Sequence, residues 1–202
     1  MSAGKKSILL IALILIIDQI LKIWVKTHMV LGEEIHLFGK WGMLHFVENN
    51  GMAFGMEMGG KPGKFVLSVF RIIAIFAIGW FLNSIIRKKV NPGLILAVSV
   101  VFAGAIGNII DSAFYGMMFN ESYLQPAVLF PPGGGYSSFL HGKVVDMFYF
   151  PIINTHWPNW FPIMGGESFI FFRPVFNIAD SSITCGVISI ILFQKKMFRD
   201  FN

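Results

Sequence analysis

The sequence predicts an all-α membrane protein: a four-transmembrane-helix bundle whose outward-facing loops have room for a small β-sheet over the outer rim. Composition is the first observation, since 55% of residues are hydrophobic and only 13% are charged. The mean hydropathy of +0.67 also lies outside the range of soluble domains. Finally, the apolar residues gather in four stretches, each near the roughly 20 residues that cross hydrocarbon. Residues 1–202 are therefore expected to form a single membrane domain.

The four candidate spans lie at about residues 7–25, 65–86, 94–114 and 175–193. The first could be mistaken for a secretory signal, because Lys5 and Lys6 precede it. However, no small-residue cleavage site follows, and the hydrophobic pattern continues past Asp18 and Lys22. We therefore expect a retained span, in which Asp18 and Lys22 share one helix face and neutralise each other as an ion pair.

Lysine and arginine near the span ends predict the orientation. The basic clusters are Lys5-Lys6, Arg87-Lys88-Lys89 and Lys195-Lys196. With four spans they all fall on one side, which the positive-inside rule makes cytoplasmic. Both termini are then inside, and the connections 26–64 and 116–174 face outward. The net charge of +5 reflects this topology, so no nucleic-acid partner is expected.

The outward connections carry their own patterns. Apolar residues at partly alternating positions within 32–60 predict short strands over the outer rim. The longer connection contains the turn-rich segment 131–135 and the aromatic residues Trp157 and Trp160. Aromatic residues beside span ends usually anchor a protein at headgroup level, and we favour that function here. A lid over the site is the alternative.

Polar residues recur at similar depths in three of the spans. At 1.5 Å per residue, Asn108 lies ~21 Å from the cytoplasmic end at Leu94, and Asp180 lies ~8 Å below the outer end at Val175. The side chains that this places in the outer half of the bilayer are Asp18, Lys22, Asn108, Asp111, Asn177 and Asp180. A polar pocket open to the outside explains this arrangement most simply.

Asp146 and Asp180 are the leading candidates for chemistry. An ionisable group near hydrocarbon costs on the order of 2.5–3.5 kcal/mol, so it points to a function, and two carboxylates suggest an acid/base pair. Two such groups a few Å apart share one proton, which allows one to activate water while the other protonates a carbonyl oxygen. The lone Cys185 and five scattered histidines offer no metal-binding spacing. Neither a metal nor another cofactor is expected.

A small multi-span ion or proton transporter is the alternative function. Asp18, Asp111 and Asp180 would then line an ion path. Transport requires access from both sides, whereas the inner halves of the spans, such as 94–103 and 187–193, carry almost no polar residues. The sequence also lacks obvious inverted repeats. Hydrolysis is favoured, and transport remains the second hypothesis.

Five sequence blocks, spread in order over most of the chain, carry a family resemblance. They are Asp18-Gln19-x-x-Lys22, Asn49-Asn50-Gly51-Met52-Ala53-Phe54-Gly55, Gly104-Ala105-Ile106-Gly107-Asn108-Ile109-Ile110-Asp111, Val144-Val145-Asp146 and Phe176-Asn177-Ile178-Ala179-Asp180. Together they make the sequence similar to bacterial lipoprotein signal peptidase, or signal peptidase II, a family of aspartic peptidases.

The resemblance implies an activity. Asp146 and Asp180 would be the catalytic pair of an endopeptidase that cuts a prolipoprotein on the amino side of its diacylglyceryl-modified cysteine. It further implies that asparagines line the site and that charged residues support it: Asn49, Asn108, Asn177, Asp18, Lys22 and Asp111. A monomer surrounded by lipids of the bacterial inner membrane is expected, with the site near the outer face.

Two departures from the family pattern stand out. The family usually has arginine after the aspartate of the third block, whereas here Ser112 follows Asp111. Arg173, just outside the fourth span, is a candidate to supply the missing group. The connections from Asp111 to Asp146 and from Asp146 to Asn177 are also longer than in compact members of the family.

Overall fold

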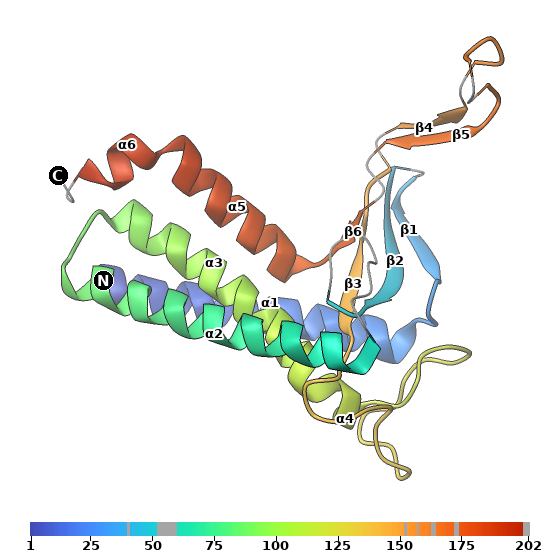
Figure 1. The fold of residues 1–202 in the computed structure, drawn as a ribbon, viewed down its shortest axis with the longest axis horizontal. Coiled ribbons are helices and arrows are strands. Elements are labelled where there is room, and N and C mark those ends of the chain that lie inside the picture. Colours follow the sequence, from blue (N-terminus) through green and yellow to red (C-terminus); the bar gives the residue numbers. More distant parts are fainter. Residues whose placement is uncertain are drawn as a thin grey trace.

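The computed structural model describes residues 1–39, 41–51, 60–151, 153–156, 158–162, 165–171 and 174–199. Its helices are α1 (Ala3–His28), α2 (Gly60–Arg87), α3 (Pro92–Ile110), α4 (Gly116–Met118), α5 (Ile178–Leu192) and α6 (Gln194–Met197), with the π-helical turn η2 (Asp111–Tyr115) between α3 and α4. Figure 1 shows the long helices side by side, with both termini at the end away from the sheet. The central helix is α3, which packs against α1, α2 and α5.

Three helices are long and apolar enough to cross a membrane: Ala3–His28, Pro62–Arg87 and Pro92–Met118. They confirm the first three expected spans. The fourth apolar helix, Ile178–Leu192, is shorter. The predicted start of this span at Val175 is wrong, because Val175 and Phe176 form strand β6 and pair with Tyr149 and Phe148.

A four-stranded antiparallel sheet stands at the other end of the helices (Figure 1), so the protein is not purely helical. Its order is β1 (Glu34–Phe38), β2 (Gly42–Asn49), β3 (Val144–Tyr149) and β6 (Val175–Phe176). Strands β1 and β2 confirm the prediction for 32–60. A separate two-stranded hairpin, β4 (Ile153–His156) and β5 (Ser168–Phe171), extends beyond this sheet (Figure 1).

Glycines bring α3 and α5 into close contact. A Cβ at Gly104 would lie 2.3 Å from the carbonyl oxygen of Ala179, and a Cβ at Gly186 would lie 2.6 Å from Cγ2 of Val101. Small residues allow membrane helices to approach closely where a larger side chain would hold them apart. Because Asn108 lies one turn beyond Gly104, this packing places the first turn of α5 beside Asn108.

An apolar core joins the C-terminal end of α1 to the sheet. Val25 and Met29 pack there with Phe46 of β2 and with Val145 and Met147 of β3. Val145 and Met147 point to the opposite face of the strand from Asp146, because side chains alternate along a strand. The core therefore fixes the direction in which Asp146 points.

Candidate active site

Asp180 lies in the first turn of α5, where its position is set by the helix cap. The side chain of Asn177 accepts a hydrogen bond from the Asp180 amide at 2.8 Å, and the Asp180 carboxylate accepts one from the Asn177 amide at 3.4 Å. This reciprocal arrangement is a capping box. Since α5 begins at Ile178, Asp180 is only ~3 Å from the start of the helix. The ~8 Å expected from the sequence was counted from Val175, which is three residues before the helix begins.

Asparagine side chains link Asp180 to Asp146 of β3. Asn177 Nδ2 donates to Asp146 Oδ1 at 2.6 Å and to Asn108 Oδ1 at 3.1 Å. Asn108 Nδ2 in turn donates to Asp180 Oδ1 at 2.7 Å. Asn49 Nδ2 completes the group by donating to Asp146 Oδ2 at 3.3 Å. Four separate segments thus bring the two aspartates and three asparagines to one place.

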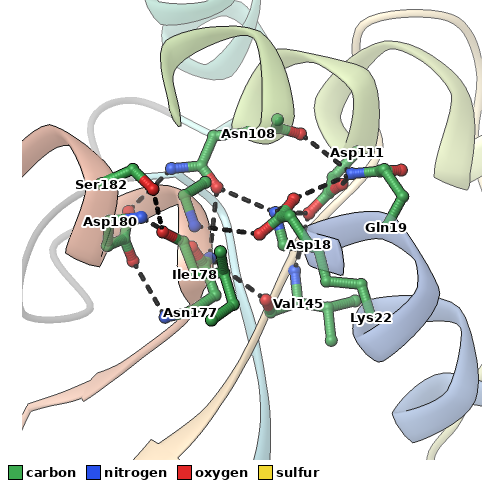
Figure 2. A network of polar contacts seen from close by, with 12 residues as sticks. Asp18, Gln19, Lys22, Asn108, Asp111, Val145, Asn177, Ile178, Asp180 and Ser182 are labelled. Atoms are coloured by element: carbon green, nitrogen blue, oxygen red, sulfur yellow. Dashed lines mark hydrogen bonds and ion pairs between the residues drawn. The ribbon is translucent and has the colours of Figure 1, made fainter. Parts of the chain in front are cut away.

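A buried group of charged side chains, Asp18, Lys22 and Asp111, lies beside these residues, and we call it the inner triad (Figure 2). Lys22 Nζ is 2.9 Å from Asp18 Oδ2 and 2.9 Å from Asp111 Oδ2. The expected Asp18–Lys22 ion pair is confirmed, and Asp111 joins it. Lys22 also donates to Asn108 Oδ1 at 3.0 Å. Figure 2 shows Asn108 between Asp180 and the triad.

The triad also holds the backbone next to both aspartates. Asp18 Oδ1 accepts a hydrogen bond from the Ala179 amide at 2.9 Å, and Asp111 Oδ2 accepts one from the Val145 amide at 3.2 Å. Each of these amides belongs to the residue directly before one of the two aspartates. Because Lys22 binds both carboxylates, one side chain ties α5 and β3 to α1 and α3. The triad therefore holds the backbone directly before each of the two aspartates.

The electrostatic environment favours a proton on Asp146. Burial raises the pKa of the Asp146 carboxyl to about 7, and the neighbouring Asp180 charge acts in the same direction. Hydrogen bonds from Asn49 and Asn177 only partly oppose this shift. A carboxyl that keeps its proton near neutral pH can donate it to a reacting oxygen. Over the part of the chain that the structure describes, no group of histidine, cysteine or carboxylate residues could hold a metal ion.

Some residues singled out in the sequence cannot be placed. The structure does not describe Arg173, Trp157 or residues 52–55 of the second block. Ser112 is buried and donates to the Asn108 carbonyl oxygen at 3.2 Å. Sequence reasoning missed Arg71, whose charge acts on Asp180 and Asp146. A signal existed, because Arg71 is the only charged residue between Lys64 and Arg87.

Comparisons with known proteins agree on one family. The family model for signal peptidase (SPase) II matches residues 10–196. A lipoprotein signal peptidase of Porphyromonas gingivalis is 51% identical over 190 residues, covering 94% of this chain and 82% of the relative. One from Amoebophilus asiaticus is 35% identical over 187 residues, covering 91% and 75%.

Solved structures point the same way. A structure described as a bacterial membrane enzyme is similar with a TM-score of 0.60 and 27% identity, covering 95% of this chain and 88% of that one. A second with the same description has a TM-score of 0.59 and 29% identity, covering 93% and 91%. None of these comparisons supports a transporter. With the matched family model spanning nearly the whole sequence, this chain belongs to the signal peptidase II family.

Proposed function

We propose that this protein is a lipoprotein signal peptidase, an aspartic endopeptidase that removes the signal peptide from diacylglyceryl-modified prolipoproteins. It cleaves on the amino side of the lipidated cysteine. The observation that carries the proposal is the joint attachment of Asp146 and Asp180 to Asn177, at 2.6 Å and 3.4 Å. Two carboxyl groups held by one residue can act on one water molecule and one peptide bond.

The chemistry follows from the different environments of the two carboxyl groups. Asp180 is the anionic member: it removes a proton from water as the water oxygen attacks the scissile carbonyl carbon. Asp146 holds the proton and donates it to the carbonyl oxygen, which gives a gem-diol. When the C–N bond breaks, Asp180 gives its proton to the leaving nitrogen and Asp146 takes one back from a gem-diol hydroxyl, so that the starting protonation of the pair is restored. No covalent intermediate forms.

The asparagines and the inner triad have supporting functions in this mechanism. Asn108 and Asn177 hold the carboxylates through amide groups that carry no charge, and Asn49 does the same for Asp146. The triad fixes the backbone on which the pair is mounted. Preorganised groups of this kind lower the barrier because they need not reorganise during the reaction.

The membrane arrangement is also part of the proposal. Residues 1–202 form one domain in the bacterial inner membrane, with α1, α2, α3 and α5 as four spans and both termini in the cytoplasm. The sheet and the pair then lie at the outer face, where a lipid-modified cysteine of the outer leaflet can reach them. The protein acts as a monomer among lipids. The β4–β5 hairpin, with Trp160 79% exposed, anchors the chain at headgroup level.

The decisive experiment is cleavage of a diacylglyceryl-modified precursor by purified Asp146→Asn and Asp180→Asn variants in nanodiscs. Each should lose at least ~10³-fold in kcat/KM, since removing one member of a unit disables the whole. Glu167→Gln, an exposed acid beyond the sheet, is the matched control and should cleave normally. Near-normal cleavage by either Asp variant would refute the pair. Ion flux through the wild type without cleavage would instead support the transporter.

A further inference from the structure

Arg71 is a single charge inside an apolar helix. It lies ~16 Å along α2 from Gly60 at a rise of 1.5 Å per residue. Nothing else between Lys64 and Arg87 is charged. Ionisable residues in such positions are costly, and they usually face a polar site and serve it. The surroundings of the guanidinium group indicate which function Arg71 has.

The guanidinium group of Arg71 is held by Gly51, two residues after Asn49 of β2. Arg71 Nη2 donates to the carbonyl oxygen of Gly51. Gly51 has a φ of +96°, and a Cβ there would lie 2.7 Å from Arg71 Nη1, so only glycine leaves room for this contact. The Gly51 amide donates to Asn49 Oδ1 at 2.8 Å, and Asn49 donates to Asp146. Arg71 is therefore tied to the aspartate pair through a short chain of contacts.

The guanidinium group is near the pair but does not bind it. Its charge acts on Asp180 first and then on Asp146. Among the described residues, Arg71 donates no hydrogen bond to either carboxylate, and Gly51 is its one hydrogen-bond acceptor. A guanidinium carries five N–H donors. Within the described part of the chain, several N–H donors of Arg71 are thus left to bind another molecule.

The geometry points to Arg71 as a substrate-binding residue whose guanidinium donates to a backbone carbonyl oxygen of the signal peptide next to the scissile bond. This inference rests on the proposed function. Arginine can only donate, so its partner must be an acceptor. A carboxylate or phosphate would add a second negative group beside the Asp180 carboxylate, whereas a peptide carbonyl is neutral.

An extended substrate needs such a donor. Where a peptide leaves its helix to be cut, its carbonyl groups lose their internal partners, and the membrane offers little water to replace them. Arg71 would meet that need from the second span. It would also place in α2 the arginine that the family resemblance leads us to expect after Asp111, where this chain has Ser112.

A measurement of substrate affinity tests the inference independently of catalysis. Binding of a diacylglyceryl-modified precursor peptide is measured on the Asp180→Asn protein in nanodiscs, with and without Arg71→Met. Loss of a hydrogen bond from a charged donor should weaken binding about 10- to 100-fold. In the active enzyme, KM should rise by a similar factor. Arg87→Met, at the far end of the same helix, should change neither value.

Arg71→Lys separates substrate binding from a purely structural contact. Lysine keeps the positive charge and can still donate to Gly51. It lacks the planar guanidinium group, whose several N–H donors have a fixed geometry. We expect it to retain most of the affinity defect. Wild-type affinity in Arg71→Lys, or unchanged affinity in Arg71→Met, would overturn the inference. If Arg71→Met does not insert, Arg71→Lys decides alone. A wild type that fails to cleave the precursor would instead contradict the proposed function.

Discussion

Two buried groups of charged side chains begin one helical turn apart on α1. One is the inner triad, which contains Lys22. The other, which we call the outer cluster, consists of Lys26, Glu48 and Lys143. Lys22 and Lys26 are both fully buried. Lys26 Nζ binds Glu48 Oε1, and Lys143 Nζ lies 3.0 Å from Glu48 Oε2. Both groups join a fully buried lysine to a carboxylate, but the triad has two carboxylates on one ammonium group, whereas the outer cluster has two ammonium groups on one carboxylate.

The groups differ in what their other contacts reach. Lys22 donates to Asn108, and its partner carboxylates hold the amides before Asp146 and Asp180. Lys26 instead donates to Ser122 Oγ at 2.9 Å and lies 5.0 Å from the ring centre of Tyr136. The outer cluster therefore fastens the connection after α4 to the sheet. Buried charge alone does not identify a catalytic residue, because the contacts around it decide what it supports.

Lys22→Met should cause the largest loss in this comparison, about 100-fold or more in kcat/KM. Removing the ammonium leaves Asp18 and Asp111 buried without a counter-charge, and breaking a buried pair in this way costs about 3–5 kcal/mol. Asn108 also loses a donor, so the spacing of Asp146 and Asp180 is no longer fixed. The measurement is steady-state cleavage of the lipidated precursor in nanodiscs, with Tm recorded on the same samples.

A matched rescue separates positioning from simple unfolding. Lys22→Met combined with Asp18→Asn and Asp111→Asn removes the uncompensated charge and should recover Tm. Activity should stay low, because the ammonium group that joined α1 to Asp111 and donated to Asn108 is gone, even though the new asparagine oxygens can still accept from the Ala179 and Val145 amides. Near-wild-type turnover in this triple variant would mean that the triad does not position the pair.

The next largest effect is a pH dependence, which should separate Asp146, whose backbone the triad holds, from the outer cluster. Asp146, with its pKa raised to about 7, is protonated below that pH and loses its proton above it. Since the mechanism needs that proton, kcat/KM should fall up to tenfold per unit as pH rises above about 7. Glu48 of the outer cluster should not titrate there: despite its burial, the Lys26 and Lys143 charges lower the pKa of Glu48 below its ordinary value.

Glu48→Gln is the control for this profile. It should leave the alkaline limb in place, because Glu48 is already ionised throughout that range. The assay follows cleavage from pH 5.5 to 9, with substrate binding measured in parallel on the Asp180→Asn protein. A flat profile up to pH 9 would contradict the assignment of the proton to Asp146.

Much of this molecule could be predicted from local patterns in the sequence. Apolar length predicted the first three spans, and the spacing of Asp18 and Lys22 predicted their ion pair. The helix cap was not foreseen, although Asn177 and Asp180 have the spacing of a capping box. Val175 and Phe176 are apolar enough to extend a span, so hydropathy placed its start too early. Their pairing with β3 is a tertiary contact that hydropathy does not record.

Contacts between distant segments account for the rest. Nothing local indicates that Asp111 accepts from the Val145 amide, or that Lys26 on α1 meets Glu48 on β2. Arg71 could have been noticed as a lone charge in a span, but its proximity to Gly51 depends on how α2 packs. Sequence therefore predicted the residue types in the site better than their connections.

Lys26→Met should give the smallest change in activity, with kcat/KM within about threefold of the wild type. Glu48 keeps Lys143 as a partner at 3.0 Å, so no bare carboxylate is created. The lost hydrogen bonds to a charged group are worth about 2 kcal/mol. That value corresponds to a fall in Tm of about 4–8 °C for a protein of this size. Limited proteolysis should cut the 120–140 segment faster.

The exposed Lys6→Met is the matched control and should leave Tm, proteolysis and activity unchanged. If Lys26→Met instead reduced turnover as strongly as Lys22→Met, the outer cluster would share in positioning Asp146 through β2 and β3, and the distinction between the two groups would fail.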